Sequence, residues 1–86
     1  MSEKPRLTKE NVKKILEKND AMKFSVQSSG KNYDLTNTYY VEDGQMYQRQ
    51  AGKTSLDGYV DHTYKLTHEN TQQVIRRHAD KFDFSI

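Results

Sequence analysis

The dipeptide Asp43-Gly44 restricts the fold of this chain more than any other feature. It lies between two short segments in which large apolar and polar residues alternate, as they do in a β-strand. A two-residue type I′ turn needs a positive φ angle at both positions, and Asp-Gly is one of the pairs that adopts it most readily. The sequence therefore predicts an antiparallel hairpin with its turn at this dipeptide.

The turn also fixes the register of the hairpin, because a two-residue loop leaves only one way to pair its strands. Tyr40 is predicted to lie opposite Tyr47 on one face, and Val41 opposite Met46 on the other. The flanking pairs are Glu42 with Gln45 and Tyr39 with Gln48. If helices cover the Val41 and Met46 face, the two tyrosines are left exposed.

Three further segments alternate with strand period: residues 22–26, residues 33–41 and residues 59–66. The polar run Thr36-Asn37-Thr38 interrupts the second of them, and we expect a bulge or an exposed edge there. Residues 51–58 contain two glycines and are expected to form a loop, which leaves the strand order open.

Two segments have the pattern of short capped helices. Thr8 and Thr67 each precede such a segment and can cap it by accepting a hydrogen bond from an unpaired backbone N–H. Apolar residues three and four apart give each helix one narrow apolar stripe, made of Val12, Ile15 and Leu16 in the first and of Val74 and Ile75 in the second.

The two ends of the chain also resemble each other. Residues 7–11 match residues 66–70, and the alternating segment 22–26 matches residues 82–86 after one inserted residue. Residues 7–26 and 66–86 are therefore either a duplicated αβ unit or two independent instances of a good helix start. In both cases residues 82–86 are expected to form a final strand.

The predicted fold is a single small α+β domain spanning residues 7–86, after a flexible tail at residues 1–6. Its elements follow the order α-β-β-β-β-α-β, with an antiparallel-rich sheet of four or five strands and two helices packed on one face. Hydrophobic residues make up only 33% of the chain and charged residues 30%, so the core must be small. The sequence resembles no known family closely enough to name one.

Composition excludes several classes of function. The chain has no cysteine, which removes disulfides, thiolate metal sites and cysteine nucleophiles. It contains no apolar run long enough to span a membrane and no apolar leader, so a cytoplasmic protein that does not act in a membrane is expected. A homodimer or a partner complex would add buried surface to a core this small.

Catalysis finds little support in the sequence. Asp61 and His62 are adjacent in a predicted strand, so their side chains point to opposite faces and cannot form a dyad. His68 and His78 lie far from His62, with no metal-ligand spacing. We therefore expect no enzyme activity, no catalytic or metal-binding residues and no cofactor.

Nucleic-acid binding is the alternative function. Residues 1–26 contain seven Lys or Arg against four Asp or Glu, although the whole chain carries a net charge of only +2. The candidate phosphate-contacting residues, all on the first helix, are Lys9, Lys13, Lys14 and Lys18. Opposite charges four residues apart, such as Glu10 and Lys14, indicate an ordinary solvated helix instead.

The preferred prediction is a small non-enzymatic binding or regulatory protein that acts through a tyrosine-rich sheet face. Tyr40 and Tyr47 are the candidate partner-binding residues, because tyrosine combines a broad apolar surface with a polar hydroxyl and suits protein interfaces. A stabilising cross-strand pair on a solvated face is the alternative reading of the same two residues. The expected partner is another protein or a second copy of the chain.

Overall fold

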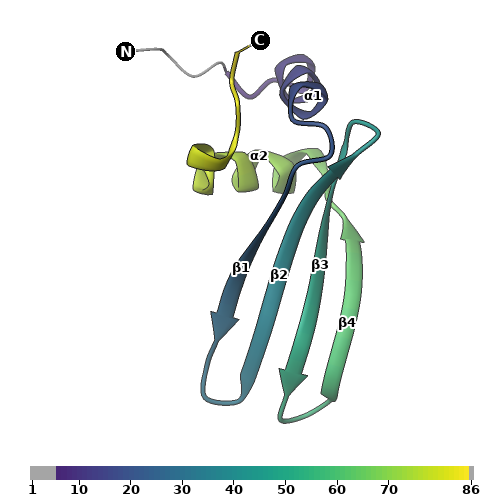
Figure 1. Cartoon of the computed structure of the whole chain (residues 1–86), viewed down its shortest axis with the longest axis vertical. Helices are drawn as coiled ribbons and strands as arrows, with labels where there is room; N and C mark the ends of the chain where they lie inside the picture. Colours follow the sequence, from purple (N-terminus) through teal and green to yellow (C-terminus); the bar gives the residue numbers. More distant parts are fainter. Residues whose placement is uncertain (1–5, 86) are drawn as a thin grey trace.

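The computed structural model describes residues 6–85 and shows an α+β domain with one four-stranded antiparallel sheet (Figure 1). The strands follow each other in space in the order β1-β2-β3-β4, so the sheet is a simple meander. The elements are α1 (Lys9–Lys18), β1 (Lys23–Ser29), β2 (Tyr33–Glu42), β3 (Gln45–Thr54), β4 (Gly58–Lys65), α2 (His68–Arg77) and the short 3₁₀ helix η1 (Ala79–Lys81).

The hairpin predicted at Asp43-Gly44 is confirmed. Asp43 has a φ of 53° and Gly44 a φ of 75°, the two positive angles that a type I′ turn requires. Tyr40 pairs with Tyr47 and β2 pairs with β3 over its full length. The register inferred from this dipeptide therefore holds along all ten residue pairs.

The expected loop at residues 51–58 is wrong. β3 continues to Thr54, β4 begins at Gly58, and only the three residues between them form a turn. Thr54 pairs with Tyr33 on one side and with Gly58 on the other. Backbone pairing on both sides, rather than apolar content, extends this strand, and it fixes the strand order that the sequence left open.

The bulge or exposed edge expected at Thr36-Asn37-Thr38 is also wrong. β2 is a central strand, and these three residues keep an unbroken register with both neighbours. Asn37 is buried, and its side-chain oxygen accepts hydrogen bonds from the amides of Gln48 (2.9 Å) and Gln50 (3.3 Å). A polar residue is tolerated inside the sheet because its hydrogen-bonding capacity is met there.

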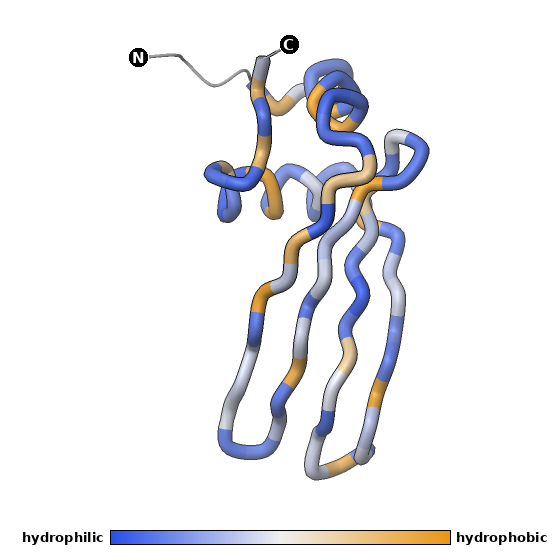
Figure 2. The backbone as a smooth tube through the Cα atoms, in the orientation of Figure 1, coloured by the Kyte–Doolittle hydropathy of each residue, from blue (hydrophilic) through white to orange (hydrophobic). Residues whose placement is uncertain are grey.

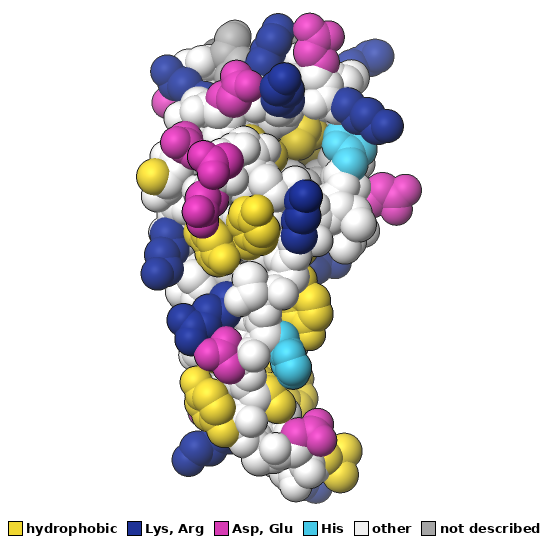
Figure 3. Space-filling model, turned by 90° about the vertical axis from the view of Figure 1, so that its right-hand side faces the viewer, with side chains coloured by type: hydrophobic (Ala, Val, Ile, Leu, Met, Phe, Trp, Pro, Cys, Tyr) yellow, Lys and Arg dark blue, Asp and Glu magenta, His cyan; other side chains and the backbone are white. Residues whose placement is uncertain are grey.

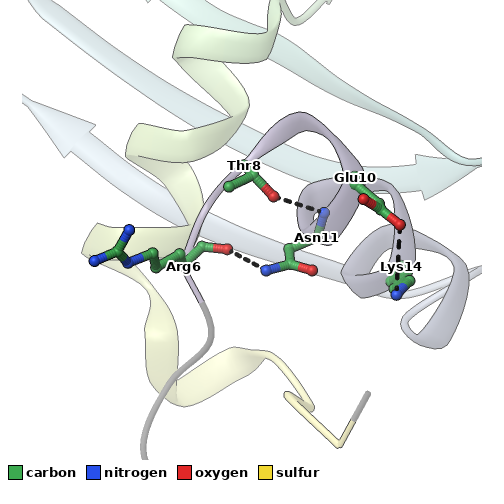
Figure 4. A network of polar contacts seen from close by, with 5 residues as sticks. All are labelled: Arg6, Thr8, Glu10, Asn11 and Lys14. Carbon is green, nitrogen blue, oxygen red and sulfur yellow. Dashed lines mark hydrogen bonds and ion pairs between the residues drawn. The ribbon is translucent and has the colours of Figure 1, made fainter.

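Both helix starts are confirmed. The hydroxyl oxygen of Thr8 accepts from the backbone N–H of Asn11 (Figure 4). The hydroxyl oxygen of Thr67 likewise accepts from the backbone N–H of Asn70. The matching caps extend the likeness between the two chain ends to the helices, while the duplication itself stays a prediction. Asn11 also donates its side-chain amide to the carbonyl of Arg6.

The predicted C-terminal strand is wrong for residues 82–85, and Ile86 lies outside the described residues. The backbone of Asp83 bonds the side-chain amide of Asn19 instead of a strand, at 2.8 Å from its N–H and 2.9 Å to its carbonyl. Phe82 is buried and packs edge-on against Phe24. The C-terminal apolar residues thus complete the core without joining the sheet.

The core lies at one end of the molecule (Figures 1 and 2). Its buried residues come from both helices, from β2 and β3 beside the Asp43-Gly44 turn, from the connection between β4 and α2 and from the C-terminal segment: Val12, Ile15, Leu16, Val41, Met46, Leu66, Val74, Ile75 and Phe82. The strands run on well past the helices, which gives the molecule extents of 43 × 27 × 20 Å. The far part of the sheet therefore projects beyond the end of the molecule that holds the helices.

Two other expectations concern the chain termini and membranes. Of the expected tail at residues 1–6, only Arg6 belongs to the described part of the chain. Between residues 6 and 85, no helix combines the length and apolar character needed to cross a membrane.

Candidate functional site

The two faces of the sheet differ completely in charge. We call the face that carries Tyr40 and Tyr47 the tyrosine face, and the face that carries Val41 and Met46 the core face. Residues opposite each other in the register share a face, so the pairing assigns every strand residue. All Lys, Arg, Asp and Glu residues of the four strands lie on the tyrosine face: Lys23, Asp34, Glu42, Arg49, Lys53, Asp61 and Lys65.

Tyr40 and Tyr47 stack on each other on the two central strands of the tyrosine face, close to the Asp43-Gly44 turn. Their ring centroids are 5.3 Å apart with an angle of 18° between the ring planes, and both side chains are half-buried. Lys23 pairs with Tyr40 and Lys65 with Tyr47, so the two rings form a row across all four strands with a lysine at each end. This row could contact a partner with the ring edges and the two ammonium groups.

Apart from the exposed Tyr59, the rest of the tyrosine face is mostly polar and carries several hydrogen bonds within the face. Arg49 donates from Nε (2.9 Å) and Nη2 (2.6 Å) to the two carboxylate oxygens of Asp61. These hydrogen bonds hold the pKa of Asp61 below its usual value and raise the pKa of Arg49. Ser25 and Thr38 share a further hydrogen bond of 3.0 Å. A surface of this kind is stable in water without a partner.

The lysines of α1 do not form one phosphate-binding row. The four are Lys9, Lys13, Lys14 and Lys18. Successive helix residues are rotated by about 100°, so the first two lie on one flank of the helix and the last two on another. Glu10 and Glu17 lie between the flanks, and Lys14 approaches Glu10 at 3.8 Å (Figure 4). The two glutamates therefore separate the two pairs of lysines.

The three histidines lie in separate places. His62 is exposed on the core face of β4, whereas Asp61 lies on the other face. His68 begins α2, and His78 ends it, packing against the rings of Phe24 and Tyr39. Within residues 6–85, no three His, Asp or Glu side chains are grouped closely enough to hold a metal ion.

The core face beyond the helices forms the surface that we call the distal patch. Its apolar side chains, five from the core face and one from the turn between β3 and β4, are Val26, Tyr33, Leu35, Leu56, Val60 and Tyr64. Tyr33 is 43% exposed, Tyr64 46% and Leu56 92%. Figure 3, a view from the side of β4, shows hydrophobic side chains on both sides of the projecting sheet.

The middle of the distal patch carries no Lys, Arg, Asp or Glu side chain. Asn37 and Gln50 fill it with a bonded amide pair, and Gly52 leaves a gap between Leu35 and Val60 in the same cross-strand row. Glycine is required at position 52: its φ is 151°, and a β-carbon there would lie 2.8 Å from the Cα of Leu35. A hollow near the tip, lined by Tyr33, Leu35 and Leu56 among others, adjoins this row.

The distal patch was not among the predicted sites, although the sequence carries its signal. In each strand every charged residue occupies the alternate positions that fall on the tyrosine face. The predicted loop at residues 51–58 concealed this pattern, because it left four of the ten residues of β3 out of the sheet. It also hid how far the sheet extends beyond two helices of ten residues each.

No protein-family model, no curated protein and no solved structure matches this chain. The case for its function therefore depends on the surfaces of the chain itself.

Proposed function

We propose that this chain is a small non-enzymatic binding protein of the cytoplasm that engages another protein surface, or a second copy of itself, through its sheet. The distal patch carries the proposal. A face without lysine, arginine, aspartate or glutamate continues past the helices that cover its other end. Exposed apolar side chains gathered on one uncharged face of a small protein favour an interaction site.

The tyrosine row is the second proposed contact surface. Tyr40 and Tyr47 retain exposed edges, and Lys23 and Lys65 at the ends of the row suit a partner with acidic groups. Part of each ring is already covered by the other ring. The row therefore offers a partner less free apolar surface than the distal patch does.

Site-specific photocrosslinking in cells that express the full chain tests the proposal. A photoreactive amino acid replaces Tyr64 in the distal patch, Tyr47 in the tyrosine row or, as the control, the exposed Lys18 on α1. We expect Tyr64 to give protein adducts of defined mass that Lys18 does not give. If neither sheet position gives adducts beyond those of Lys18, the binding function is refuted.

A further inference from the structure

We propose that the occupant of the distal patch is the distal patch of a second copy, packed face to face about a twofold axis. This inference rests on the proposed binding function and names the partner. A twofold axis brings the same surface of both copies together, so a charge at the axis meets its own copy, and a charge elsewhere needs an opposite charge at the matching position. The core face of the strands carries none of the seven charged strand residues, which makes it compatible with itself.

Charge also argues against an anionic occupant. A nucleic acid or an acidic peptide needs lysine or arginine at the contact, and the cationic side chains of the strands point to the opposite face. His62 is the one imidazole on the core face of the sheet. Gln48 and Gln50 carry no charge, and each donates one amide N–H to Asn37, so the remaining N–H and the oxygen of each amide need hydrogen bonds across the dimer interface.

Layer thickness fits the same arrangement. Sheets that pack face to face lie about 10 Å apart, close to the thickness of the helical layer that a sheet carries in an α+β domain. A second sheet on the distal patch would therefore lie in the same layer as α1 and α2. The projecting sheets of the two copies would point in opposite directions. The turn at Leu56 of each copy then meets the helical end of the other, and both core faces are covered along their length.

The size of the patch predicts the strength of the dimer. The uncovered stretch of β3 runs from Gln48 to Thr54 at about 3.3 Å per residue, and the four strands are spaced about 4.8 Å apart. The face is thus about 20 Å in each direction, or roughly 400 Å² per copy. Stable interfaces bury about 800 Å² per partner. We therefore expect a weak dimer that forms at micromolar or higher concentration.

Sedimentation equilibrium of the purified full chain, from about 10 μM to 1 mM, tests this dimer. Val60→Lys puts a charge in the distal patch, and Tyr59→Lys puts the same charge on the adjacent residue of the same edge strand, facing the other way. We expect Val60→Lys to raise the dissociation constant at least about tenfold and Tyr59→Lys to change it less than about threefold.

If Val60→Lys lowers the thermal midpoint, a second matched pair, Tyr64→Lys and Thr63→Lys, replaces the first. Tyr64 is already 46% exposed, so a lysine there should disturb the fold less. A chain that stays monomeric to 1 mM overturns the inference, as does a dimer that both members of each pair weaken equally. Crosslinks from position 64 to a different protein would sustain the binding function while refuting the second copy as occupant.

Discussion

Tyr40 stacks on Tyr47 across the hairpin, with ring centroids 5.3 Å apart. The Asp43-Gly44 turn fixes the register of the two strands, and that register brings the two rings together. Stacked cross-strand aromatic rings stabilise a sheet even where one face meets water. The pair therefore has a structural role whether or not a partner binds to it.

A double-mutant cycle measures that role. Replacing Tyr40 and Tyr47 by alanine, singly and together, should reveal a coupling of about 0.5–1.5 kcal/mol in the free energy of unfolding. Urea denaturation of the four proteins at low concentration supplies the values. Strictly additive effects would show that the two rings do not stabilise each other.

Gly52 is predicted to be the least replaceable glycine of the sheet. Gly52→Ala should lower the free energy of unfolding by more than about 2 kcal/mol, because the new methyl group meets the backbone of β2 at Asp34 and Leu35. Gly58→Ala is the matched control: its φ of 68° is also positive, but a β-carbon there has open space. The control should lose only about 1 kcal/mol. Equal losses in chemical denaturation would contradict the close approach.

Acid should weaken the fold partly through Asp61. Its pKa is lowered in the folded chain by the hydrogen bonds from Arg49, so the stability it supplies is present above the usual aspartate pKa near 4. That contribution is lost as the pH falls through the lowered, folded pKa. Thermal midpoints recorded between pH 6 and about pH 2 should fall less steeply for Asp61→Asn than for the parent chain. Parallel curves would refute this assignment.

Phe82 should stabilise the fold although it belongs to no strand. Phe82→Ala is expected to cost about 3 kcal/mol, because it empties a buried site against Phe24. Lys81→Ala, at the exposed neighbouring position, should stay within about 0.5 kcal/mol of the parent.

A chain that ends after Asp80 should also unfold at a clearly lower temperature. An unchanged midpoint for that truncated chain would show that the C-terminal segment contributes little.

Nucleic acid is expected to bind only weakly to α1. Because Glu10 and Glu17 separate the two lysine pairs, few phosphates can be neutralised at once. The slope of log K against log salt for duplex DNA should therefore be shallower than about −2. A slope near −4, abolished by Lys13→Gln with Lys14→Gln, would restore nucleic-acid binding as the function.

Local signals made much of the fold predictable. Thr8 and Thr67 mark the helix starts, and Asp43-Gly44 fixes ten residue pairs, because capping and turn chemistry depend on neighbouring residues alone. The extension of β3 to Thr54 depends instead on backbone pairing with β2 and β4. Residues 51–54 have too few apolar side chains to indicate a strand by their sequence. Tertiary pairing overrides composition there.

The C-terminal segment shows the same limit. Phe82 and Phe84 alternate with polar residues as a strand would, but the side chain of Asn19 bonds the backbone between them. That contact joins residues 64 apart in the sequence. It follows from the packing of the finished core rather than from any local pattern. The distal patch was missed for a related reason, since its extent depends on how far the sheet outreaches the helices.

The absence of cysteine permits a direct measurement of the distal patch, because one introduced thiol is the only one in the chain. Val60→Cys and Tyr59→Cys place that thiol on opposite faces of the same edge strand. The second-copy account predicts that maleimide labels the Val60→Cys chain several-fold more slowly at 1 mM than at about 10 μM, while Tyr59→Cys reacts at the same rate at both. Concentration-independent labelling of Val60→Cys would contradict it.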